Sequence, residues 1–179
     1  MLILMGLRGS GKTTVGKLVA RRLGDEGQFV DLDDLVAEAG TALVGRKTTA
    51  GEVLRTQGEP AFRALEYATL RLAAAHRPAV LSLGGGTPTH PASNAFLRDL
   101  AVGTERPATL VYLRATPSTL VRRLGGTDLS LRPSLTGKGV LEEVDQVFQQ
   151  RDEPYLALAT RVIDVDLLTP QQTAETLVG

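Results

Sequence analysis

The chain has 179 residues, of which 42% are hydrophobic, 22% are charged and none is cysteine. Because its 20 basic and 20 acidic side chains cancel, no net charge favours nucleic acid or an anionic membrane, and no apolar run approaches the ~20 residues that a membrane span needs. The lack of cysteine excludes disulfides, zinc–thiolate sites and thiol nucleophiles and suits a reducing cytoplasm. The length predicts one domain over residues 1–179. We expect a cytoplasmic monomer that binds neither nucleic acid nor membrane.

The first residues combine an apolar strand with a phosphate-binding motif. Residues 2–5 (LILM) are typical of a buried parallel strand, and residues 6–13 (GLRGSGKT) fit the pattern G-x-x-x-x-G-K-[ST]. The glycines let backbone N–H groups point at phosphate oxygens, Lys12 can reach the β- and γ-phosphates, and the Thr13 hydroxyl can ligate Mg²⁺. A helix from about Lys12 to Gly24 adds its dipole. The pattern therefore predicts a nucleotide site; the alternative is a glycine-rich turn that binds nothing.

Strands and helices alternate along the rest of the chain. Short apolar runs predict four more strands, at 28–31, 79–83, 108–113 and 161–165. Helical spacing predicts helices at 33–39 (closed by Gly40), from 52 to a break at Gly58, and at 60–75, 92–101, 117–124, 140–159 and 170 onward. Residues 41–51 and 125–139 are expected to be loops. This alternation predicts an α/β fold with a five-stranded parallel sheet covered by helices on both faces.

An acidic cluster follows the second strand, which we expect to lie beside the first. Ligands of such sheets bind at the carboxyl ends of the strands, where this cluster would meet the phosphate loop. Asp31 and Asp33 would point to opposite sides of an extended chain and do different jobs. We expect Asp31 to join Thr13 at Mg²⁺, while Asp34 is expected to be a helix cap or a solvated residue.

A triple glycine and three arginines complete the candidate site. Gly84, Gly85 and Gly86 follow the third strand directly, which indicates a ligand lying on the backbone; packing is the alternative. Arg63 can pair with Glu66 at i,i+3 spacing. The two other arginines are Arg132, in the loop at 125–139, and Arg151, on a late helix. Each alone would be a solvated charge, but together they suit an anionic substrate and a closing cation.

At this point the chain resembles shikimate kinases along essentially its whole length. The matching segments are GLRGSGKTT at 6–14, DLD at 31–33, GEPAFRALE at 58–66, SLGGGT at 82–87, RRLGG at 122–126, RP at 132–133 and RDEPY at 151–155. The resemblance implies a P-loop kinase of the nucleoside-monophosphate-kinase style, with a lid at about 125–139 and a substrate-binding region at about 33–66. It implies transfer of the ATP γ-phosphate to the 3-hydroxyl of shikimate, in aromatic amino-acid synthesis, with Mg²⁺.

The resemblance also implies roles for individual residues. Asp33 would hold the shikimate hydroxyl, and Arg63 and Arg151 would grip the carboxylate beside the glycines at 84–86. Lys12 and Arg132 would stabilise the transferring phosphoryl group. The implied nucleotide-binding residues are Gly9, Ser10, Gly11, Lys12, Thr13, Thr14, Arg123 (stacked on adenine) and Arg132, and the implied metal ligands are Thr13 and Asp31.

Three departures from the family pattern stand beside these matches. They are Ser134 after the lid Arg132-Pro133, a longer segment at 41–48, and Leu168 where some members have a second arginine near adenine. None removes a proposed catalytic group. Two alternatives stay open: another small-molecule kinase of this fold, such as a gluconate kinase, and a nucleotide-binding module without turnover.

Overall fold

The computed structural model describes residues 1–24, 27–103, 105–126, 139 and 141–179. Its strands are β1 (Leu2–Met5), β2 (Phe29–Asp31), β3 (Val80–Ser82), β4 (Thr109–Arg114) and β5 (Arg161–Asp164). All pairings are parallel, and the order across the five-stranded sheet is β2-β3-β1-β4-β5. The predicted sheet is confirmed in strand number and direction. The prediction that the first two strands are adjacent in the sheet is wrong, because β3 lies between β1 and β2.

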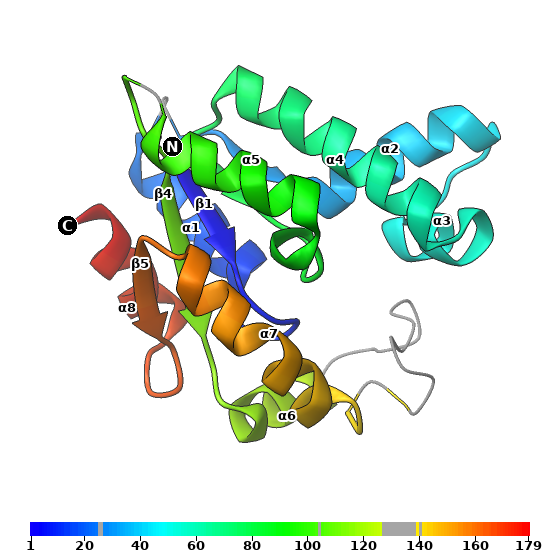
Figure 1. Cartoon of the computed structure of the whole chain (residues 1–179). Coiled ribbons are helices and arrows are strands. Elements are labelled where there is room, and N and C mark those ends of the chain that lie inside the picture. Colours follow the sequence, from blue (N-terminus) through cyan, green and yellow to red (C-terminus); the bar gives the residue numbers. More distant parts are fainter. Residues whose placement is uncertain (25–26, 104, 127–138, 140) are drawn as a thin grey trace.

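Helices enclose this sheet on both faces. They are α1 (Lys12–Arg22), α2 (Leu32–Val44), α3 (Ala50–Gln57), α4 (Glu59–His76), α5 (Pro91–Val102), α6 (Pro117–Gly125), α7 (Val144–Leu158) and α8 (Pro170–Val178), with a 3₁₀ turn η2 at Thr87–Thr89. Helices α1 and α8 pack together, whereas α5 and α7 pack against β4 on the other face (Figure 1). A Cβ at Gly16 of α1 would meet the Phe29 ring and lie 3.3 Å from Leu4 Cδ1, so the glycine lets α1 approach the sheet closely.

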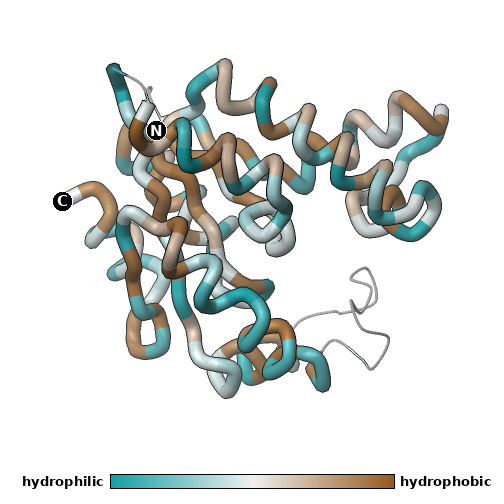
Figure 2. The backbone as a smooth tube through the Cα atoms, viewed as in Figure 1, coloured by the Kyte–Doolittle hydropathy of each residue, from teal (hydrophilic) through white to brown (hydrophobic). Residues whose placement is uncertain are grey.

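The core is made from the strands themselves. Ile3, Leu81, Leu110 and Leu113 are fully buried, and Figure 2 shows hydrophobic residues concentrated along the strands. Near-continuous apolar strands are expected of a parallel sheet that is covered on both faces. Within the described residues, none of the helices combines the length and the apolar character that a membrane span requires.

Helices α2, α3 and α4 form a projection at one end of the sheet (Figure 1). The expected loop at 41–51 is partly wrong, because α2 continues through Gly40 and α3 starts at Ala50. A Cβ at Gly40 would meet Val53 of α3, so this glycine marks a helix–helix contact instead of a helix end. Gly45, with φ 70°, ends α2, and a capping box of Thr49 and Glu52 starts α3.

Candidate active site

The phosphate loop joins β1 to α1. Gly9 and Gly11 have φ of 86° and 97°, a left-handed conformation that other residues adopt only at a cost. Gly11 caps α1, so the free N–H groups of the first turn face the loop. Lys12 Nζ donates to the carbonyls of Gly6 (2.8 Å) and Leu7 (3.2 Å). Its charge is thereby held over the loop, in the setting that phosphate groups require.

Thr13 and Asp31 lie together at the carboxyl end of the sheet. Thr13 Oγ1 donates to Asp31 Oδ2 over 2.9 Å, while Asp31 Oδ1 accepts from the backbone N–H of Asp33 and caps α2. The cap is therefore Asp31, and Asp34 is an exposed residue in the first turn. A hydroxyl and a carboxylate side by side fit Mg²⁺, which takes few protein ligands and completes its shell with phosphate and water. The described residues contain no cluster of three or more histidine, cysteine, aspartate or glutamate side chains that could hold a metal ion.

Asp33 lies in the first turn of α2, so the expectation of an extended chain between the two aspartates is wrong. The two carboxylates still face different partners. A Cβ at Gly84 would lie 2.7 Å from Asp33 Oδ1, which places the carboxylate against the glycine backbone. Asp33 is exposed to the water that fills the cavity, but the protein packed against its carboxylate partly desolvates it. This desolvation, with repulsion from Asp31, raises its pKa to about 6, although Lys12 opposes the shift.

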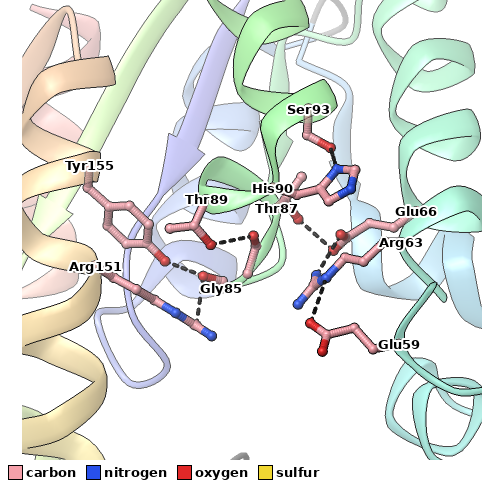
Figure 3. A network of polar contacts seen from close by, with 11 residues as sticks. Glu59, Arg63, Glu66, Gly85, Thr87, Thr89, His90, Ser93, Arg151 and Tyr155 are labelled. Carbon is pink, nitrogen blue, oxygen red and sulfur yellow. Dashed lines mark hydrogen bonds and ion pairs between the residues drawn. The ribbon is translucent and has the colours of Figure 1, made fainter.

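Arg63 forms an ion pair with the buried carboxylate of Glu66, which also lies on α4. Its Nη1 donates to Glu66 Oε2 over 2.7 Å, and Glu66 Oε1 accepts from the Thr87 hydroxyl over 2.6 Å. The Glu66 side chain is only 2% exposed. A Cβ at Gly86 would lie 2.7 Å from Arg63 Nη1, so this guanidinium lies against the Gly86 backbone. Figure 3 shows the contacts of Arg63 with Glu66 and Glu59.

Arg151 approaches the same glycines from α7, and in Figure 3 it lies on the opposite side of Gly85 from Arg63. Its Nη1 donates to the Gly85 carbonyl over 2.8 Å, and the Tyr155 hydroxyl donates to the same oxygen. The three glycines thus face three side chains: Gly84 faces Asp33, Gly85 faces Arg151 and Gly86 faces Arg63. The sequence predicted a ligand on this backbone; the structure shows that each glycine also makes room for a polar side chain.

Arg123 bridges α6 to the far end of the phosphate loop. Its Nη2 donates to the Val165 carbonyl over 2.6 Å, and its Nη1 makes a long contact of 3.5 Å with the Ser10 carbonyl. Leu168 and Thr173 line the cavity beside it. The guanidinium is therefore fixed between the phosphate loop and the segment after β5, where a planar ring can stack on it.

A single cavity of about 930 Å³ connects these groups. The predicted site residues that line it are Gly9, Ser10, Gly11, Lys12, Thr13, Thr14, Asp31, Asp33, Arg63, Gly84, Gly85, Gly86, Arg123 and Arg151. The predicted lid at about 125–139 is described only at Gly125, Gly126 and Gly139, and Arg132 lies outside the described residues. The cavity thus contains the phosphate loop and the two arginines that contact the triple glycine. Asp33 interacts electrostatically with Lys12 of the loop and with Glu66, the partner of Arg63.

The sequence did not predict two hydrogen bonds that orient these side chains, from Tyr155 to Gly85 and from Thr87 to Glu66. Tyr155 follows Arg151 by four residues, a spacing that places both on one helix face. The spacing does not predict which group the tyrosine hydroxyl contacts. Glu66 was recognised only as a partner for Arg63, because nothing in the sequence shows that Thr87 approaches it from another element. These contacts depend on how η2 and α7 pack, which spacing alone does not reveal.

Comparisons with known proteins show the family of the chain. The family model described as shikimate kinase matches residues 8–179. "Shikimate kinase 2" of Enterobacter sp. (strain 638) is 36% identical over 179 residues, which cover 99% of this chain and 92% of that protein.

Solved structures share the fold. The structure of shikimate kinase from Acinetobacter baumannii in complex with shikimate has a TM-score of 0.80 at 26% identity, covering 99% of this chain and 89% of that one. A gluconokinase from Sinorhizobium meliloti 1021 has a TM-score of 0.55 at 20% identity, covering 97% of this chain and 87% of that one. The second likeness shows the fold alone.

Proposed function

The chain belongs to the shikimate kinase family, and from this premise we propose which of its residues perform the reaction. The enzyme is an ATP-dependent kinase that transfers the γ-phosphate to the 3-hydroxyl of shikimate and gives shikimate 3-phosphate. One observation supports the assignment of the site most strongly: a single cavity holds the phosphate loop, Asp33 and the arginine pair. A nucleotide and a small carboxylic acid can therefore meet at one carboxylate.

Asp33 aligns the attacking hydroxyl. Its carboxylate accepts a hydrogen bond from that hydroxyl and fixes the line of attack on the γ-phosphate. Because phosphoryl transfer has a loose transition state, alignment contributes before the proton has left the oxygen. A pKa near 6 keeps Asp33 ionised at neutral pH and makes it a better proton acceptor than an ordinary aspartate.

Arg63 and Arg151 hold the substrate carboxylate from opposite sides. Each guanidinium offers five N–H donors in a planar fork, and each uses only some of them on Glu66 or Gly85. The remaining N–H groups donate to the substrate carboxylate, and the backbone of the glycines at 84–86 contacts the shikimate ring. This arrangement selects a substrate with one carboxylate at a fixed distance from the reacting hydroxyl.

The nucleotide end is assigned to the phosphate loop. Lys12 and the loop N–H groups bind the phosphates, Arg123 stacks on adenine, and Arg132 is proposed to reach the γ-phosphate from the lid. Thr13 and Asp31 would hold Mg²⁺. When bound, the ion neutralises phosphate charge that protein groups alone would have to offset.

We propose three further properties of the enzyme. They are the single-domain organisation over 1–179 with its lid, a monomeric state and a cytoplasmic location. Non-catalytic nucleotide binding is the less economical alternative, because a binder has no use for an aligned carboxylate between two ligands.

Substrate choice is tested by one assay. ADP release is measured with shikimate, gluconate and nucleoside monophosphates as acceptors, at equal concentrations and saturating ATP. We expect turnover with shikimate at least a hundredfold above the others. Faster turnover of gluconate would move the chain to the other kinase class, and ATP binding without turnover of any acceptor would leave a binding module.

A further inference from the structure

The Gly85 carbonyl is a shared acceptor at the floor of the substrate site. Arg151 Nη1 donates to it over 2.8 Å, and the Tyr155 hydroxyl donates to it from one helical turn farther along α7. A carbonyl oxygen has two lone pairs, and these two donors occupy both. Because glycine backbone rotates more freely than that of other residues, the orientation of this peptide depends on its partners.

Tyr155 is well placed to fix that peptide. The residue is fully buried, and its ring packs edge-on against Tyr112 with 5.1 Å between centroids. Burial raises its pKa to about 12, so the hydroxyl keeps its proton and donates at any physiological pH. The donor therefore comes from a side chain that packing holds in one orientation.

The helix segment that carries Arg151 is braced next to this ring. Asp152 accepts two hydrogen bonds from Arg114, of 2.8 and 2.9 Å, and one of 2.8 Å from the Tyr112 hydroxyl. The hydrogen bonds from Arg114 hold the pKa of Asp152 below its ordinary value, so the pair stays ionised. The α7 backbone at Arg151 is thereby fixed to β4. The orientation of the Arg151 side chain then depends on the contacts of its guanidinium.

We propose that Tyr155 is a positioning residue for the acceptor site: its hydroxyl fixes the Gly85 carbonyl so that Arg151 donates to it and keeps its other N–H groups aimed at the substrate carboxylate. The proposal rests on the assignment of Arg151 to that carboxylate. Tyr155 does not itself touch the reacting atoms. It should therefore affect the binding of shikimate and leave the chemical step and the nucleotide site unchanged.

Tyr155→Phe removes the hydroxyl and keeps the ring, so the variant is expected to fold. We expect KM for shikimate to rise about five- to tenfold, the effect of losing one hydrogen bond to a buried acceptor, while kcat and KM for ATP stay within about twofold. Tyr112→Phe is the matched control. It also removes a buried hydroxyl beside α7, but Asp152 keeps both bonds from Arg114, so KM for shikimate should change less than about twofold.

The same substitution in an Arg151→Ala background tests the route of the effect. If Tyr155 acts through Arg151, adding Tyr155→Phe should change KM for shikimate by less than about twofold there. An equal rise in both backgrounds, no rise in the wild-type background, or a comparable fall in kcat would overturn the proposal. If Arg151→Ala alone leaves KM unchanged, the assignment of Arg151 fails and the proposal fails with it. A large effect of Arg151→Ala with none of Tyr155→Phe defeats the positioning role alone.

Discussion

Arg63 Nη1 donates to Glu66 Oε2 over 2.7 Å, and the carboxylate that receives it is 2% exposed. A charged pair at such depth is held in one geometry, because neither group can exchange its partner for water without cost. The other acidic neighbour of Arg63 differs: Glu59 lies 3.5 Å from Nε with 71% of its side chain exposed. Glu66 is therefore the residue that sets the orientation of Arg63.

Glu66→Gln should weaken shikimate binding. The amide oxygen can still accept from Thr87, but the amide nitrogen then faces Arg63, donor against donor. Loss of a charged hydrogen bond of about 1.5–3 kcal/mol predicts a rise in KM for shikimate of about tenfold or more, with KM for ATP unchanged. Glu59→Gln is the control, and as an exposed pair it should leave both constants within about twofold. Equal effects of the two substitutions would contradict the assignment.

Alanine at two neighbouring glycines should separate turnover from binding. Neither Gly84 nor Gly86 has a positive φ, so backbone conformation alone does not exclude alanine. A Cβ at Gly84 would lie 2.7 Å from Asp33 Oδ1, whereas a Cβ at Gly86 would lie 2.7 Å from Arg63 Nη1. Gly84→Ala should lower kcat by about tenfold or more, with a smaller rise in KM for shikimate because its Cβ would also lie 3.0 Å from Glu66 Oε1. Gly86→Ala should chiefly raise KM for shikimate. Steady-state kinetics on both variants checks this, and identical profiles would argue against it.

The sequence predicts the sheet and the phosphate loop well because both depend on local patterns. The run at 2–5 is apolar throughout, as a covered parallel strand requires, and the glycines of the loop are needed for its backbone conformation. The position of β3 between β1 and β2 is not local information. It depends on which strands the chain returns to after each helix, and the strand sequences alone do not distinguish the possible orders.

The glycines show the same limit at the level of single residues. Gly40 and Gly45 are both plausible helix ends, yet only Gly45 ends α2, because Gly40 packs against Val53. Likewise the residues proposed to contact substrate were predicted from motifs, while the contacts of Tyr155 with Gly85 and of Glu66 with Thr87 join distant parts of the chain. A side chain that supports another is visible only once the elements are packed.

Lys12→Ala should impair both nucleotide binding and turnover. We propose that its charge acts on the phosphates in the ground state and in the transition state, and its Nζ also donates to the carbonyls of Gly6 and Leu7. We expect kcat/KM for ATP to fall by about a hundredfold or more. Lys17→Ala is the matched control, since Lys17 lies on the same helix with an exposed side chain. Near-normal activity of Lys12→Ala would remove the phosphate loop from the mechanism.

Asp33→Asn should keep ATP binding and lose turnover. The amide retains the shape and one acceptor oxygen but not the charge, so we expect kcat to fall by about two to four orders of magnitude. In the wild type, kcat/KM for shikimate should fall as pH drops below about 6, where Asp33 becomes protonated. Asp34→Asn, an exposed change in the same helical turn, should leave the profile intact. A variant at position 33 that keeps more than about a tenth of wild-type turnover, a loss under ~1.4 kcal/mol, would exclude Asp33 as the catalytic carboxylate.

The same raised pKa predicts that Asp33 lowers the stability of the folded enzyme. An unfolded aspartate has a pKa of about 3.9, whereas desolvation and Asp31 raise that of Asp33 to about 6. The folded state therefore binds this proton more tightly, and the contribution of Asp33 to stability falls as pH rises from about 4 through about 6. Asp33→Asn removes this cost. Its Tm should exceed that of the wild type at pH 8, and the difference should shrink as pH falls toward about 4. A difference that does not change with pH, or a less stable variant at pH 8, would show that the site does not disfavour the ionised carboxylate.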